Sequence, residues 1–178
     1  AIAHVLRCFE DGDVTHVEGR VDPVADAETI ETELMLADIE SIEKRLQNIV
    51  RKVRGGDKEA VQQERLMRAA LAVLEEGKPA TKPVLYVGNV GESEAAEGNA
   101  LSARVGEMAA AEGNMHVIIS AQIEEEISQL ELEEAQMFLD EMGLSEAGLD
   151  RLIRAGYELL HLETYFTVGP KEARAWTI

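Results

Sequence analysis

"PVLYVGNVGESEA", residues 83–95, contains a short apolar run, VLYV, that ends at a glycine and an asparagine and precedes a helix-forming stretch. Strand-forming residues bounded in this way predict a buried strand. A second run of the same kind, MHVIIS at residues 115–120, follows a segment of helical composition. Strand, helix and strand in this order are typical of a parallel crossover, so this stretch places the chain in the α/β class.

The flanking sequence predicts more strands and helices of the same body. We expect a strand over residues 2–9 that ends in the acidic turn EDGD, and a helix over 93–112 that Gly113 stops. One acidic helix is expected over 121–142, and Ser145 can cap the helix that follows it. Residues 163–178 have strand composition around a turn at Gly169 and Pro170. With strands and helices alternating, the sheet is expected to be mostly parallel.

Between the first two strands lies a long helical segment with an apolar repeat. The repeat has spacings of 4, 3, 4, 3 and 4 and consists of Met35, Ile39, Ile42, Leu46, Ile49 and Val53. Gly55 and Gly56 can end this helix, and Asp57 can cap a second helix whose apolar stripe continues through Leu74. The pattern predicts an antiparallel coiled-coil hairpin, either projecting from the body or lying flat on it, followed by the linker EEGKPATKP.

Composition limits the classes of protein that the chain can represent. Apolar residues make up 46% of the 178, but no apolar run approaches the roughly 20 residues that span a bilayer, so no membrane contact is expected. The 17 basic and 35 acidic residues give a net charge of −18, which disfavours unaided nucleic-acid binding unless the basic residues cluster on one face. The single cysteine, Cys8, excludes an internal disulfide, and without a secretory signal the expected location is the cytoplasm.

Polar residues follow two of the expected strands where a parallel sheet places its ligand crevice. Asn89 and Ser120 occupy these places. An Asn amide carries the donor and the acceptor that a purine edge requires, and the carboxylate of Glu92 can accept hydrogen bonds from ring N–H groups. The backbone around Ser120 and Ala121 could donate to the same ring. The alternative is that Asn89 is a turn residue and Glu92 a first-turn acid that stabilises a helix N-terminus.

No phosphate-binding loop accompanies these residues. The pattern GxxxxGK[ST] is absent from the sequence, and VRGGDK joins two helices rather than a strand and a helix. We therefore expect that this chain does not cradle a triphosphate by itself.

Several segments together resemble the YchF or Obg-like ATPase family of P-loop GTPase relatives. The matching segments are HVLRCFEDGDVTHVEGRVDPVADAETIETELMLADIESIEKRL, the RGGDK turn, KPVLYVGNVGE and GLDRLIRAGYELLHLETYFTVGPKEARAWTI. The resemblance implies a partial nucleotide-binding G domain over residues 1–31 and 82–178, with a coiled-coil hairpin inserted at 32–81. It also implies binding and hydrolysis of ATP or GTP by the complete protein, a requirement for Mg²⁺, and association with ribosomes.

The resemblance also implies roles for individual residues. The family reads the base with NxxE in place of the NKxD of ordinary GTPases, and this motif corresponds to Asn89, Val90, Gly91 and Glu92. Val90 would make a backbone contact to adenine, and Ser120 with Ala121 would form the second base-contacting segment. No catalytic residue or metal ligand is assigned to this chain.

The sequence departs from the family pattern in three places. The family's P-loop and magnesium-binding switch would lie before Ala1, and its small TGS domain would lie after Ile178, so the chain alone is expected to be inactive. The stretch EEGKPATKPVLYV is also shorter than the family pattern, through residues missing near Pro79 to Lys82 or through a genuine deletion. A second hypothesis is a helical interaction module without a ligand site, in which a basic protein is the partner or the complete protein contacts rRNA.

Overall fold

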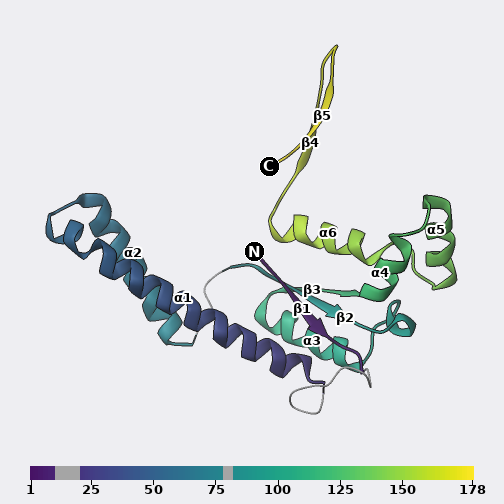
Figure 1. Ribbon diagram of the computed structural model, residues 1–178, viewed down its shortest axis with the longest axis horizontal. Helices are drawn as coiled ribbons and strands as arrows, with labels where there is room; N and C mark the ends of the chain where they lie inside the picture. Colours follow the sequence, from purple (N-terminus) through teal and green to yellow (C-terminus); the bar gives the residue numbers. More distant parts are fainter. Residues whose placement is uncertain (11–20, 78–81) are drawn as a thin grey trace. The chain divides into compact units, whose positions relative to one another are not determined.

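The computed structural model describes residues 1–10, 21–77 and 82–178 of the chain (Figure 1). The chain divides into two compact units, Ala1–Val24 with Pro83–Ile178, and Ala25–Lys82. The predicted EDGD turn, apart from its first residue, and residues 78–81 of the predicted linker lie outside the described residues.

The first unit contains a three-stranded parallel sheet in the order β1-β2-β3. Its strands are β1 (Ile2–Arg7), β2 (Val84–Asn89) and β3 (Met115–Ile119). In the register, Arg7 lies opposite Asn89, which lies opposite Ile119. The carboxyl ends of all three strands therefore meet at one edge of the sheet, and the predicted α/β class with a parallel sheet is confirmed.

The middle strand β2 is buried because helices cover both faces of the sheet. Alternate residues of a strand point to opposite faces. Leu85 and Val87 pack with Ala155 of α6 (Gly148–Leu159), whereas Gly88 lies beside Ser102 of α3 (Ala100–Glu112). The sheet is thus a layer between α3 and α6.

The α3 face of the sheet carries a buried polar anchor. Tyr86 is fully buried, and its hydroxyl donates a hydrogen bond of 2.8 Å to a carboxylate oxygen of Glu112 in the last turn of α3. Burying a phenol is favourable only when its hydroxyl finds such a partner. This bond fixes the end of α3 against the middle strand.

Most of the second unit is a pair of helices. They are α1 (Pro23–Arg54) and α2 (Lys58–Glu75), which lie side by side in Figure 1. Gly56 takes a left-handed φ of +78°, which an L side chain rarely adopts, and Asp57 accepts hydrogen bonds from the backbone N–H groups of Glu59 and Ala60. The predicted break and cap between the two helices are therefore confirmed.

The first strand ends at Arg7 rather than at the predicted residue 9, and three helix boundaries in the first unit also differ from the sequence predictions. The helix predicted from residue 93 begins at Ala100, because Asn99 caps it with its side chain and a short 3₁₀ turn, η1 (Glu92–Glu94), precedes it. The single helix predicted over 121–142 is two helices, α4 (Ala121–Ile127) and α5 (Leu132–Glu141). The predicted cap at Ser145 is also wrong, since α6 starts at Gly148 with Ala147 at its N-cap position.

The C-terminal segment forms an antiparallel hairpin of β4 (Thr164–Val168) and β5 (Ala173–Thr177), as the strand composition predicts. All ten of its strand residues are exposed. Within the described part of the chain, no helix is both long and apolar enough to cross a bilayer.

Candidate functional site

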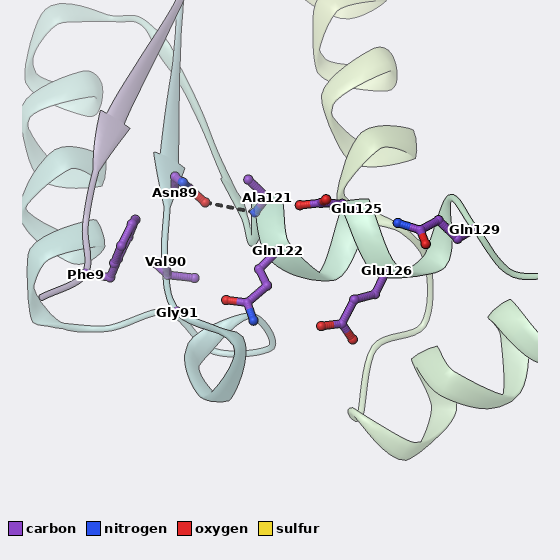
Figure 2. A pocket seen from close by; sticks show the side chains of 9 residues that line it. All are labelled: Phe9, Asn89, Val90, Gly91, Ala121, Gln122, Glu125, Glu126 and Gln129. Carbon is purple, nitrogen blue, oxygen red and sulfur yellow. Dashed lines mark hydrogen bonds between the residues drawn. The ribbon is translucent and has the colours of Figure 1, made fainter. Parts of the chain in front are cut away.

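A cavity of about 550 Å³ lies at the sheet edge where β2 and β3 end. Its volume is within the range of small-molecule pockets. It is lined by Phe9, Asn89, Val90, Gly91, Ala121, Gln122, Glu125, Glu126 and Gln129. In Figure 2, Phe9 lies to one side, Asn89 and Val90 lie in the middle, and Gln122 and Glu126 of α4 lie to the other side.

The side chain of Asn89 joins the two predicted loops. Its Oδ1 accepts a hydrogen bond of 2.9 Å from the backbone N–H of Ala121 (Figure 2). This bond ties the end of β2 to the first residue of α4 and orients the amide. Among the described residues, no acceptor is bonded to Nδ2 of Asn89, which leaves two N–H donors for a ligand.

The backbone N–H and the carbonyl of Val90 differ in their hydrogen bonding. Its N–H donates to the carbonyl of Ile119 at 2.9 Å, and the residue as a whole is 2% exposed. The N–H is therefore committed to holding the loop, whereas the carbonyl of Val90 accepts no hydrogen bond among the described residues. A carbonyl at this position can accept a hydrogen bond from an amine.

Ala121 lines the cavity, but its N–H already bonds to Asn89. The expected donation from this N–H to a ring is thus replaced in the structure by a donation to the Asn89 amide. Ala121 orients the asparagine and contributes the surface of its methyl group.

Glu92 and Ser120 lie next to the cavity without lining it. Glu92 begins the turn η1, one residue after Gly91, and is half-buried. Ser120 is 2% exposed, occupies the N-cap position of α4, and its buried hydroxyl has no hydrogen-bond partner among the described residues. The structure therefore brings Asn89, Val90 and Ala121 together at the cavity, and the other two are not among its lining residues.

Sequence reasoning did not single out several residues that line the cavity. Phe9 follows β1 at the same sheet edge, so the rule that identified Asn89 and Ser120 could have found it as well. Its ring lies 4.9 Å from the guanidinium carbon of Arg7, and its carbonyl accepts from Nε of that arginine at 3.0 Å. An aromatic ring held in this way offers a flat apolar surface.

Helix α4 supplies the other unassigned side of the cavity. Its contributions recur at helical spacing: Gln122, Glu125, Glu126 and Gln129. Among the residues that line the cavity, two are carboxylates and none is basic. The cavity therefore suits a neutral ring with amine or ring N–H donors and would repel a phosphate.

A third carboxylate of α4, Glu124, positions the helix rather than facing the cavity. Glu124 accepts hydrogen bonds from the backbone N–H groups of Gly148 at 2.7 Å and Leu149 at 3.1 Å, at the start of α6. A carboxylate is favourable there because the first N–H groups of a helix have no partner within the helix. Within the described residues, no group of three or more His, Cys, Asp or Glu side chains is arranged to hold a metal ion.

A parallel sheet covered on both faces, with a ligand-sized cavity beyond its strand ends, defines the class of α/β folds that bind ligands at this edge. The solved structure of the Schizosaccharomyces pombe YchF GTPase matches the whole chain with a TM-score of 0.78 and 28% identity, and the match covers 55% of that protein. The fold is thus part of the P-loop GTPase fold.

Curated relatives agree with this structural match. The chain is 44% identical to the protein named ribosome-binding ATPase YchF from Bacillus subtilis (strain 168), with 99% of this chain covered. It is also 44% identical to the protein named ribosome-binding ATPase YchF from Haemophilus influenzae, with the whole of this chain covered. The chain belongs to the YchF family and spans about half the length of the relatives it matches, 54% in both cases. No family model matches the sequence.

The alignments also bear on the length of this chain. They run over 199 and 198 positions, more than the 178 residues of the chain, so these relatives contain residues that the present sequence lacks. This agrees with the expectation that the sequence is shorter than the family pattern. The expected place of this difference, near Pro79 to Lys82, falls mostly outside the described residues.

Proposed function

We propose that this chain is the base-recognition part of a YchF-type ATPase or GTPase that binds ribosomes. The observation that carries the proposal is the hydrogen bond from Ala121 to Oδ1 of Asn89, because it fixes the amide and leaves Nδ2 to donate to a ring nitrogen or carbonyl. The names of the relatives support the ribosome and the nucleotide as partners.

In this proposal a purine lies in the cavity. Nδ2 of Asn89 donates to the ring, the carbonyl of Val90 accepts from an amine, and Phe9 provides an apolar surface. Glu92 and Ser120 support the loops from behind, and Glu92 reaches the ring only if its side chain turns towards the cavity. In this proposal, recognition of the base by the NxxE motif at residues 89–92 depends mainly on Asn89 and less on Glu92.

The phosphates belong outside this cavity. Its carboxylates, Glu125 and Glu126, would repel them, and the chain contains no GxxxxGK[ST] sequence. Hydrolysis of ATP or GTP is accordingly proposed for the whole protein, with phosphate and Mg²⁺ ligands supplied by residues other than those of the cavity, and no turnover is expected from this chain alone. The proposed location is the cytoplasm, where ribosomes are found.

The proposal is tested by titrating the complete protein with ATP and GTP and comparing it with Asn89→Asp. This variant keeps an oxygen that accepts from Ala121 but loses the donor, so base affinity should fall about tenfold, which corresponds to the loss of one hydrogen bond. Glu97→Gln, on an exposed residue away from the cavity, is the matched control. Unchanged affinity for both nucleotides in Asn89→Asp would remove the assignment.

The second candidate function is a helical interaction arm, which the separate compact unit Ala25–Lys82 favours. In this case the hairpin carries the ribosome association, and the cavity needs no ligand. Deletion of residues 32–76 should then abolish co-sedimentation with ribosomes while ATP and GTP binding persist. Retained co-sedimentation after the deletion would exclude the arm from this role.

A further inference from the structure

The two loops that carry Phe9 and Val90 separate at the edge of the sheet. The backbone hydrogen bonds between them end with the bond from the N–H of Cys8 to the carbonyl of Asn89, at 2.7 Å. Beyond this point the N–H of Val90 turns to the carbonyl of Ile119, at 2.9 Å. Among the described residues no backbone hydrogen bond joins Phe9 to Val90, so another group has to fix the distance between them.

The side-chain amide of Asn99 bridges these two loops. Its Nδ2 donates to the carbonyl of Cys8 at 2.6 Å, directly before Phe9, across 91 positions of the sequence. The same nitrogen donates to Oε2 of Glu94 at 2.7 Å, in the turn η1 that follows Gly91. Because an amide nitrogen carries two N–H groups, one of them goes to each loop.

The oxygen of the same amide fixes its orientation. Oδ1 of Asn99 accepts hydrogen bonds from the backbone N–H groups of Leu101 at 3.0 Å and Ser102 at 2.9 Å, at the start of α3. Both donors of the amide and both lone pairs of its oxygen are therefore used, and a reversed amide would set N–H groups against N–H groups. The helix start holds the side chain, and the side chain holds the two loops.

Gly98 closes the turn from Glu94 to Asn99 onto α3. Its φ is +77°, which an L side chain rarely adopts, and its N–H donates to the carbonyl of Glu94 at 2.7 Å. A Cβ at Gly98 would lie 2.6 Å from Oγ of Ser102 and 2.8 Å from Cδ1 of Ile118. The close packing at this glycine leaves the bridge little room to shift.

Glu94 and its neighbour connect the bridge to the rest of the cavity. Among the described residues, the bond from Asn99 is the hydrogen bond that the half-buried carboxylate of Glu94 receives. Ala95, the next residue, is 2% exposed and belongs to one core cluster with Ile123 of α4, the helix on the other side of the cavity. A movement of η1 would therefore reach both sides of the cavity.

Helix capping alone does not account for an asparagine at this position. A cap needs a side-chain acceptor, and Ser, Thr or Asp supplies one as well as Asn does. The two N–H groups of Asn99 contribute nothing to the cap, because both point to the loops at Cys8 and Glu94. The donors of this side chain thus have a purpose that is separate from α3.

We propose that Asn99 is a positioning residue for base recognition, whose two N–H groups set the separation of Phe9 from Val90 and so the width of the cavity (Figure 2). This inference rests on the proposed function, since it takes the purine to lie in that cavity. Asn99 does not line the cavity and acts through the two loops. Loss of the bridge should weaken binding of the base and leave binding of the phosphates unchanged.

The proposal is tested on the complete protein with Asn99→Ser, which keeps an acceptor for the helix cap but lacks the two N–H donors. Isothermal titration calorimetry, well below the unfolding temperature, should show a Kd for ATP and GTP that is about five- to tenfold higher. The Kd for inorganic tripolyphosphate with Mg²⁺, which has phosphates and no base, should change less than twofold. Unchanged affinity for ATP and GTP, or an equal loss for tripolyphosphate, would overturn the proposal.

Glu94 offers a second test that leaves the helix cap intact. Glu94→Ala removes one acceptor of the bridge and should also raise the Kd for ATP, whereas Glu94→Gln keeps an oxygen for Asn99 and should stay within twofold of the wild type. Combining Glu94→Ala with Asn99→Ser should weaken binding no more than Asn99→Ser alone, because the same bond is removed. Additive losses would mean that the two side chains act independently and would contradict the bridge.

Asn114→Ser is the matched control. Nδ2 of Asn114 also donates to a glutamate, Oε2 of Glu112 at 2.9 Å, but at the other end of α3 and away from the cavity lining. Its Kd for ATP should stay within twofold of the wild type. If Asn89→Asp weakens binding and Asn99→Ser does not, the cavity assignment stands and the positioning role fails; unchanged affinity in both variants removes the two together.

Discussion

The carboxylate of Glu124 accepts the backbone N–H of Gly148 at 2.7 Å, joining the helix beside the candidate base cavity to the first residue of α6. Gly148 permits this approach because a Cβ at its position would lie 2.8 Å from Oε1 of Glu124 and 3.0 Å from Cγ2 of Ile119. The helix that lines one side of the cavity is thus held by a contact between residues that are 24 apart in the sequence.

Removing this contact should destabilise the sheet unit. Glu124→Ala leaves the first two N–H groups of α6 without their partner, which should lower the free energy of unfolding by about 1–3 kcal/mol. Gly148→Ala should also be destabilising, because either Ile119 or Glu124 must move. Urea unfolding followed by circular dichroism measures both effects. The neighbouring Glu125→Ala serves as the control and should change stability by less than about 0.5 kcal/mol.

Two substitutions of Asn89 should separate its structural role from its proposed binding role. Asn89→Ala removes the acceptor for the Ala121 N–H and should cost about 1 kcal/mol of unfolding free energy. Asn89→Asp keeps an acceptor and should cost less, although both variants lose the Nδ2 donor. Thermal unfolding compared with ATP and GTP titration checks this; equal stability of the two variants would mean that the Ala121 bond contributes little.

The sequence predicted the strands and their parallel arrangement because buried strands leave an apolar pattern that turn residues bound. VLYV and MHVIIS became β2 and β3 for this reason. The cap at Asp57 was also predictable, since a local side chain to backbone bond needs only neighbouring residues.

Helix boundaries in the acidic stretch were less predictable. Residues 121–142 form α4 and α5 rather than one helix, although no proline or glycine interrupts residues 121–142. Ile123 and Leu139, one from each helix, join a single core cluster that also contains Ala95 and Leu144. Tertiary packing of this kind overrides local helix propensity, and a single sequence does not reveal it.

The residues of the candidate site that follow the strands could be predicted from the sequence, whereas those on α4 could not. Asn89 was identified because residues after parallel strands meet at one edge. Gln122 and Glu126 have the spacing of one helix face, but an acidic helix face is usually solvated, so only the fold shows that this face lines a cavity.

Cys8 should be unreactive in the folded protein. Its thiol is fully buried, and burial, with a smaller effect of the Glu94 carboxylate, raises its pKa to about 11. At pH 8 roughly one thiol in a thousand is then ionised, and reagents do not reach it. Modification by 5,5′-dithiobis(2-nitrobenzoate) should be slow in buffer and complete within minutes in urea. Rapid modification of the native protein would show that β1 opens readily.

His116 should make the stability of the sheet unit depend on pH. Its ring occupies space left by two glycines, since a Cβ at Gly88 would lie 3.1 Å from Nε2 and a Cβ at Gly106 would lie 3.1 Å from Nδ1. Within the described residues Nε2 has no hydrogen-bond partner, and burial lowers the pKa of this histidine below its ordinary value of 6.5.

Because the folded pKa is lower than the unfolded one, the unfolded chain binds the proton first as the pH falls. The contribution of neutral His116 is therefore fully present above about pH 6.5 and is lost as the pH falls from there through the folded pKa. Unfolding free energies from urea titrations at pH 7.5, 6.5, 5.5 and 5.0 should fall more steeply for the wild type than for His116→Gln, which cannot titrate. Parallel pH profiles for the two proteins would mean that the ring is as accessible to protons in the fold as in the unfolded chain.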